Sequence, residues 1–299
     1  MSVERFALHK ICWRRVFRGQ KYANFRMLFQ GGGFNSMEYA YSCSKGCLVL
    51  TISPCLGAIN QGFMLQIVVT GASRGIGWDL VRALAAVPGR RILALSRNGD
   101  RLAMLAQECR RDFPGSEVLV YPLDLGQPLP ADFDSFIARH LGRVDVLVHN
   151  AGLLVHKPFE QLERADWLRI FDANVFGAAE LSRTLLPWLC KSARPHVLHI
   201  GSMGGFQGSS KFLGLSAYSA SKAALACLTE CLAEEWKPLG VAVNCLALGA
   251  VQTEMLQEAF PGYQAPLGSV EMGAYIAHFA VEGHRFFNGK VLPVSLSTP

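Results

Sequence analysis

A tyrosine and a lysine stand four residues apart in the segment AYSASKAAL, at Tyr218 and Lys222. The segment reads as the start of a helix, and helical spacing places both side chains on one face. A tyrosine with its ordinary pKa of about 10 is a poor base at neutral pH. A lysine ammonium about 4 Å away would favour the phenolate by roughly 4 kcal/mol at an effective dielectric constant of about 20. The pair could therefore act as an acid and base, although a surface helix could also carry both residues by chance.

Seven apolar runs of strand length must position these side chains. Most of them have too little polar alternation for one face to be wet, which is typical of parallel strands buried on both sides. Helical segments such as residues 164–189 and 217–239 separate them, so strands and helices alternate. The sequence predicts one doubly wound, Rossmann-type α/β domain over residues 64–299, with helices on both faces of a mainly parallel sheet and a ligand at the C-terminal strand ends. The seven runs are residues 65–71, 91–97, 117–125, 145–152, 196–202, 241–249 and 290–295.

A glycine-rich turn, TGASRGIG, joins the first strand to the first helix at residues 70–77. Gly71 permits a tight turn, Gly75 leaves room for a pyrophosphate, and Gly77 allows close packing of the helix on the sheet. The helix N-terminus would then offer free N–H groups to the phosphates. This placement predicts a dinucleotide site rather than a plain turn.

The second strand ends in LALSRN, with Ser96 and Arg97 where an NAD site normally presents a carboxylate. Arg97, with Arg74 from the glycine-rich turn, could pair with a 2′-phosphate. The sequence therefore favours NADP(H) over NAD(H), unless both arginines are simply solvated.

From Met64 onward the chain resembles a classical short-chain dehydrogenase/reductase. TGASRGIG matches the cofactor turn of that family, HNAG at residues 149–152 matches its NNAG motif with one substitution, and Tyr218 with Lys222 matches its Y-x-x-x-K pair. Asn174 in DANVFG and Ser202 in IGSMGG stand where the family has its helical asparagine and its catalytic serine. The resemblance implies that Tyr218 protonates a carbonyl oxygen, that Ser202 holds this oxygen, that Lys222 binds the nicotinamide ribose and that Asn174 holds a water.

The same resemblance implies a wider cofactor site. Asp124 would meet the adenine amino group, although an aspartate at a strand end can also cap a turn. Asn150 is expected to satisfy neighbouring backbone groups as well as to line the site. The implied cofactor residues are Gly71, Ser73, Arg74, Gly75, Ile76, Gly77, Arg97, Asp124, Leu125, Asn150, Ala151, Gly152, Tyr218, Lys222, Gly249, Val251 and Thr253.

The chain departs from the family pattern near the substrate. Leu248 replaces the usual proline after the sixth strand, and the segment between Ser202 and Tyr218 is longer than usual. The extra length predicts an enlarged loop, residues 206–216, over the substrate entrance. Residues 253–268 would form a mobile lid. The apolar side chains of this lid suggest a hydrophobic substrate, or they only pack the lid down.

Three function classes fit these motifs. The first is an NADP(H)-dependent oxidoreductase that interconverts a carbonyl and a secondary alcohol. The second is a silent NADP(H)-binding sensor or scaffold. The third is a sugar-nucleotide epimerase or dehydratase, whose relatives usually need a larger C-terminal region. No metal is expected, because His156, His196 and His199 lack ligand spacing with carboxylates or cysteines.

The net charge of +6 comes from residues 1–63, which contain eight Lys or Arg and two Asp or Glu, whereas the rest contains 21 of each sign. The predicted domain therefore offers no surface-charge argument for nucleic-acid binding. Residues 1–63 show no sustained periodicity and are predicted to form no folded domain. They could be upstream sequence read as protein, with translation starting at Met64, or a targeting segment. A membrane anchor is disfavoured, since Pro54 and Gly57 break the longest apolar stretch.

Cysteines are scattered without paired spacing, which favours a reducing, cytoplasmic setting. Cys227 and Cys231 are expected to be buried free thiols on a helix. A homodimer or homotetramer is expected by family resemblance alone.

Overall fold

The computed structural model describes residues 37–43, 46–52 and 64–296, and the chain divides into two compact units, Met1–Gly62 and Phe63–Pro299. In the first unit, strands β1 (Met37–Cys43) and β2 (Gly46–Ile52) pair in antiparallel register. The sequence shows no sustained periodicity here and predicted no folded domain. The β-branched and aromatic residues of MEYAYSC and GCLVLTI favour strands without the regular alternation that would have revealed them.

The second unit is built on a seven-stranded sheet in which every neighbouring pair is parallel, as predicted. The strand order is β11-β8-β7-β6-β3-β4-β5. Central strands such as β3 are buried on both faces, which explains their continuous apolar runs. The strands are β3 (Leu65–Thr70), β4 (Arg90–Ser96), β5 (Glu117–Pro122), β6 (Val146–His149), β7 (His196–Ser202), β8 (Ala242–Leu248) and β11 (Val291–Val294).

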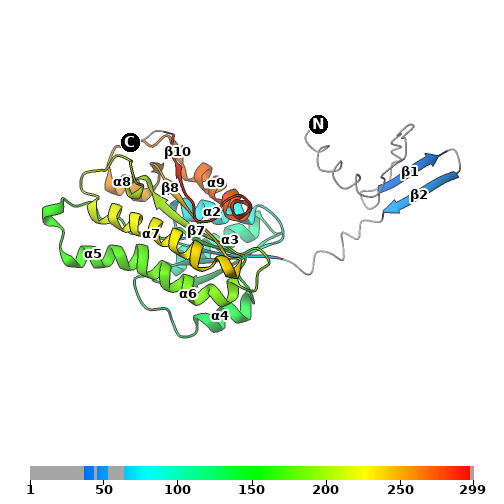
Figure 1. The fold of residues 1–299 in the computed structure, drawn as a ribbon, viewed down its shortest axis with the longest axis horizontal. Coiled ribbons are helices and arrows are strands. Elements are labelled where there is room, and N and C mark those ends of the chain that lie inside the picture. The colour runs from blue at the N-terminus through cyan, green and yellow to red at the C-terminus, as the bar shows by residue number, and fades with distance from the viewer. Residues whose placement is uncertain (1–36, 44–45, 53–63, 297–299) are drawn as a thin grey trace. The chain divides into compact units, whose positions relative to one another are not determined.

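Helices cover both faces of this sheet (Figure 1). One apolar core joins the sheet to α2 (Gly75–Ala85), α3 (Gly99–Asp112) and α9 (Ser269–Glu282). The other joins it to α4 (Phe133–His140), α6 (Gly177–Leu189) and α7 (Ser216–Glu235). The remaining elements are α5 (Arg164–Phe171), α8 (Glu254–Ala259), the short parallel pair β9 (Val251–Gln252) and β10 (Leu267–Gly268), and single turns at Phe159–Gln161, Met203–Gly205, Lys237–Leu239 and Gly283–Arg285.

The segment predicted to be helical, residues 164–189, is helical throughout but contains one irregular turn. A π-helical turn, η3 (Asp172–Phe176), separates α5 from α6. It contains Asn174, whose side-chain amide bonds with the backbone of Leu153. A π-turn inside an α-helix often marks a functional site.

Helix α7 turns Ser221, Lys222 and Leu225 inward. Cys227 and Cys231 are exposed free thiols, so the expectation that they are buried was wrong. Their positions follow the outward face of the same helix. Among the helices of the described ranges, none combines the length and the hydrophobicity needed to cross a membrane.

Candidate active site

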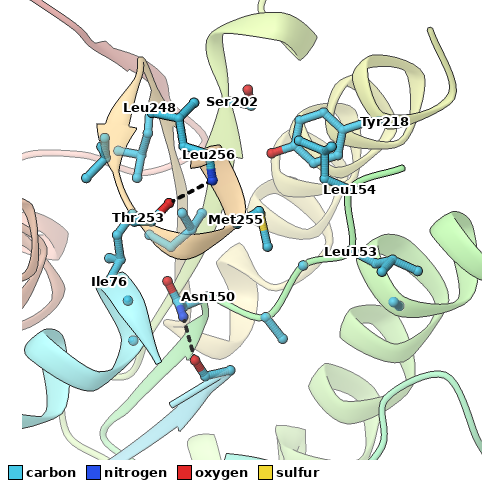
Figure 2. A pocket seen from close by; sticks show the side chains of 18 of the residues that line it. Ile76, Asn150, Leu153, Leu154, Ser202, Tyr218, Leu248, Thr253, Met255 and Leu256 are labelled. Atoms are coloured by element: carbon cyan, nitrogen blue, oxygen red, sulfur yellow. Dashed lines mark hydrogen bonds between the residues drawn. The ribbon is translucent and has the colours of Figure 1, made fainter. Parts of the chain in front are cut away.

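A cavity of about 620 Å³ opens at the C-terminal ends of the parallel strands (Figure 2). Open α/β sheets bind their ligands at this position. All but one of the predicted site residues line the cavity. The exception is Asn174, which lies behind the wall beside Ala173.

The glycine-rich turn follows β3 and has the geometry that its glycines predict. Gly71 and Gly75 have positive φ angles of 68° and 54°, a region that other residues rarely adopt. A Cβ on Gly77 would lie 2.2 Å from the carbonyl oxygen of Gly71. Helix α2 begins here without an acidic residue in its first turn and without a side-chain cap from Arg74. The backbone N–H groups at the start of α2 therefore have no side-chain acceptor, and they fit a pyrophosphate.

Asn150 joins the end of β6 to the glycine-rich turn. Its Nδ2 donates to the carbonyl oxygens of Thr70 at 3.1 Å and Gly71 at 3.2 Å. The backbone N–H of Ala151 donates to the Thr70 hydroxyl at 3.0 Å. Asn150 therefore satisfies backbone groups while it also lines the cavity.

At the β4 and β5 end of the cavity, Arg97 is exposed and lines the wall. The Ser96 hydroxyl donates to the Ser73 hydroxyl at 2.8 Å and so ties β4 to the glycine-rich turn. Asp124 accepts a hydrogen bond from the N–H of Gly126 at 3.0 Å. The turn cap considered from the sequence is present, and Asp124 also lines the cavity.

Arg74 has partners that the sequence analysis missed. Its Nη1 contacts Glu258 at 2.7 Å and Glu254 at 3.1 Å, and Nη1 of Arg101 approaches Glu254 at 3.5 Å. The hydrogen bond that Arg74 donates to the Glu258 carboxylate raises the pKa of Arg74, although partial burial opposes this shift. Ion pairs therefore connect α8 to the glycine-rich turn.

Tyr218 and Ser202 lie on the opposite side of the cavity. Desolvation by its surroundings raises the pKa of Tyr218, and a hydrogen bond with Ser202 partly opposes this. Nζ of Lys222 lies 5.9 Å from the centre of the Tyr218 ring. In the net shift of the Tyr218 pKa, desolvation outweighs the stabilisation of the phenolate that was expected from Lys222. Tyr218 is a neutral phenol at neutral pH, the form that donates a proton.

Lys222 is almost fully buried. Its Nζ donates to the carbonyl oxygen of Ile200 at 2.7 Å, and burial lowers its pKa to about 8. Gly152 lies beside it, and a Cβ there would make ordinary van der Waals contact with Nζ at 3.4 Å. A ribose could approach Lys222 along this glycine.

Asn174 positions the loop that follows β6. Its Oδ1 accepts from the N–H of Leu153 at 2.6 Å, and its Nδ2 donates to the Leu153 carbonyl oxygen at 3.0 Å. Nδ2 also donates to Ser221 at 2.9 Å, one residue before Lys222. Asn174 therefore connects the loop to α7 through hydrogen bonds that the sequence motif does not reveal.

Leu248, where the family has proline, continues β8 in regular pairing with Ser202 and Val294. Gly249 donates its N–H to the Val294 carbonyl oxygen at 2.9 Å. Thr253 caps α8 by accepting from the N–H of Leu256 at 3.2 Å, as Figure 2 shows. The substitution leaves Gly249, Val251 and Thr253 on the cavity wall.

Two buried histidines lie behind the site. His149 contacts the Ser182 hydroxyl at 2.7 Å, His199 contacts the Thr229 hydroxyl at 2.8 Å, and the two rings stack 5.0 Å apart. Burial lowers the pKa of His149 to about 3 and that of His199 well below its ordinary value. Within the described part of the chain, no three His, Cys, Asp or Glu side chains gather as metal ligands.

Comparison with known proteins places this site in a family. The family model for short chain dehydrogenases matches residues 66–264. A 3-oxoacyl-[acyl-carrier-protein] reductase of Pseudomonas aeruginosa is 26% identical over 76% of this chain and 94% of its own. A dehydrogenase/reductase SDR family member 7B of Xenopus laevis is 31% identical over 69% of this chain and 65% of its own.

A solved structure is similar as well. A short chain dehydrogenase of Shigella flexneri, described as complexed with NADP, superimposes with a TM-score of 0.71 at 27% identity, over 78% of this chain and 98% of that one. The matched region contains the glycine-rich turn, Ser202, Tyr218 and Lys222. This chain belongs to the short-chain dehydrogenase family of oxidoreductases.

Proposed function

We propose that the chain is an NADP(H)-dependent oxidoreductase that interconverts a carbonyl and a secondary alcohol, with Tyr218 as the acid and base. One observation carries the proposal. Tyr218, Ser202 and Lys222 line the same cavity as the glycine-rich turn. A dinucleotide held by that turn has its reactive end within reach of these three side chains.

The residues of the chain would divide the work as follows. Tyr218, held as a neutral phenol, donates its proton to the carbonyl oxygen as that oxygen gains charge. Ser202 hydrogen-bonds the same oxygen and orients it. Lys222 holds the nicotinamide ribose, and Asn174 keeps the Gly152 loop in place beside it. The bound dinucleotide supplies the hydride.

NADP(H) is the proposed cofactor because the cavity presents Arg97 and Arg74 near the end of β4. Guanidinium groups pair with phosphate through charge-assisted hydrogen bonds. The Shigella flexneri relative is described as an NADP complex, which supports the proposal without deciding between the two cofactors.

Tyr218→Phe tests the proposal. We expect kcat for carbonyl reduction to fall by roughly 10² to 10⁴, the usual contribution of an acid–base group, while the Kd for NADPH stays close to that of the unmodified protein. Tyr275→Phe, which changes an exposed tyrosine on α9, is the matched control. Binding would be titrated with NADPH and NADH by fluorescence, and turnover followed on a carbonyl panel.

Two outcomes of this experiment would contradict the proposal. Equal turnover by Tyr218→Phe and the control would remove Tyr218 from the reaction. NADPH binding without turnover in any of the proteins would favour the sensor or scaffold.

We further propose a cytoplasmic homodimer or homotetramer. Five free cysteines in the domain favour a reducing compartment. Exposed Leu168 on α5 and Phe176 on η3 offer apolar surface suited to a second subunit.

A further inference from the structure

Four of the five charged residues that line the cavity lie at one end, and the fifth is Lys222. Arg97 follows β4, Asp124 follows β5, and Arg74 and Glu254 pair with each other beside the glycine-rich turn. Strands β4 and β5 form one side of the sheet, next to β3. This end corresponds to the adenosine part of the proposed cofactor.

The other end of the cavity is apolar. It is formed around the ends of β6, β7 and β8, and β7 lies three strand positions from β4, or about 14 Å. Leu153, Leu154, Leu248, Met255 and Leu256 line the cavity together with Tyr218 and Ser202 (Figure 2). The apolar lining residues of this end are Leu153, Leu154, Met203, Phe212, Leu215, Leu248, Met255, Leu256, Phe260 and Tyr263.

Lys222 is the only charged residue among the described residues that line this apolar end. It is buried, and its Nζ already donates to the Ile200 carbonyl oxygen. A carboxylate or phosphate on the substrate would therefore meet no free cation there. Burial of an unpaired charge is costly, so such substrates are disfavoured.

The far wall of the apolar end is an aromatic cluster contributed by three segments. Phe260 of the lid lies 5.1 Å from the ring of His156 and 6.3 Å from the ring of Phe212. His156 contacts the Leu213 carbonyl oxygen at 3.2 Å, which holds the enlarged loop against the loop after β6. The wall is thus held in place by contacts outside the cavity.

Gly214 fits this arrangement closely. Its φ of +76° favours glycine, and a Cβ there would lie 2.7 Å from the His156 ring. Its carbonyl oxygen accepts from the N–H of Lys157 at 2.9 Å. The enlarged loop is therefore held in one position by its contacts with His156 and Lys157. In this position it limits the depth of the apolar end.

We propose that the substrate is an uncharged ketone whose alkyl or aryl group lies against Leu154, Met255 and the Phe212–Phe260 wall. The inference rests on the oxidoreductase function proposed above and narrows its substrate class. Keto acids, phosphorylated ketones and polyhydroxy ketones are poor substrates, because their polar groups would lose water without gaining partners.

The first test measures kcat/KM with NADPH for a homologous series of methyl ketones, and for a keto acid against its methyl ester. We expect kcat/KM to rise about fourfold per added methylene until the apolar end is full. The ester should exceed the acid by at least about 100-fold. A flat series, or an acid as good as its ester, would overturn the inference.

A charge-introducing variant tests the location. Met255→Arg should improve turnover of the keto acid relative to its ester by about tenfold or more, because the new cation pairs with the carboxylate. Met255→Leu is the matched control and should keep the preference for the ester. If a folded Met255→Arg protein keeps the same preference for the ester over the acid, the alkyl or aryl group of the substrate does not lie beside the lid.

A binding measurement separates this inference from the proposed function. The Tyr218→Phe protein saturated with NADPH is titrated calorimetrically with the ester and with the acid. Tighter binding of the ester supports the apolar site even if the unmodified protein reduces neither compound, in which case only the proposed function fails. Tighter binding of the acid, or equal binding of both, overturns the inference whether or not turnover occurs.

Discussion

Lys222 and His149 are buried, and burial disfavours the charged form of each. Desolvation acts on Tyr218 in the same sense. The sequence motif identifies these residues by type and spacing, but the direction of a pKa shift depends on what surrounds the side chain in three dimensions. The spacing of Tyr218 and Lys222 suggested a stabilised phenolate, whereas the surroundings of Tyr218 raise its pKa and favour the neutral phenol.

His149 makes folding stability depend on pH. Its pKa is about 3 when folded and 6.5 ordinarily, so the unfolded chain binds the extra proton between these values. Stability is fully present above pH 6.5 and falls as pH drops toward 3, by about 1.4 kcal/mol per pH unit for this residue. We expect His149→Asn, which restores the family's motif residue, to make the free energy of unfolding less steep in pH.

Urea unfolding at several pH values from 7 to about 5 would measure the change. His278→Asn, which removes an exposed imidazole, is the control. A pH slope as steep in His149→Asn as in the control would show that His149 does not titrate with unfolding.

At the scale of elements, α8 joins the lid to the glycine-rich turn through Arg74, Glu254 and Glu258. The two carboxylates would repel the 2′-phosphate that Arg74 attracts. We expect the double variant Glu254→Gln, Glu258→Gln to bind NADPH several-fold more tightly, with little change for NADH. The difference should shrink at high salt, because these groups are exposed.

Titrations of both cofactors at low and high ionic strength would check this. Glu160→Gln, an exposed change in the single turn Phe159–Gln161, is the matched control. Weaker NADPH binding by the double variant would mean that the carboxylates serve to orient Arg74.

The sequence predicted elements better than contacts between them. The strands were visible as continuous apolar runs because the central ones, such as β3 and β6, are buried on both faces. The site residues next to strand ends meet at one edge of a parallel sheet. Arg74 and Glu258 are 184 residues apart in the chain, so no local sequence pattern predicts their ion pair. Likewise, Asn174 in the π-turn bonds with Leu153, 21 residues earlier in the chain, and no local pattern predicts this contact.

At the scale of the molecule, the order of strands divides the cavity into a charged end and an apolar end. A sequence alone does not give this order, since the strands enter the sheet as β5-β4-β3 on one side and β6-β7-β8 on the other. The substrate class therefore became arguable only with the fold.

A chain that begins at Met64 tests the domain boundary. We expect this chain to fold and to bind NADPH with the same Kd. Its free energy of unfolding should lie within about 0.5 kcal/mol of that of the full chain. It keeps the Met64 carbonyl oxygen, which accepts from Arg143 at 2.7 Å and from Gln66 at 3.2 Å. Aggregation or loss of NADPH binding by this chain would show that residues 1–63 belong to the functional protein.

The most direct test of the central claim follows the hydride itself. NADPH carrying deuterium at both hydrogen positions of C4 of the nicotinamide would be incubated with the protein and an uncharged methyl ketone, and the alcohol examined by mass spectrometry. We expect one deuterium on the carbinol carbon of the product, formed in step with NADPH oxidation by the unmodified protein and nearly abolished in Tyr218→Phe. NADPH binding with no labelled alcohol from any ketone would contradict the account.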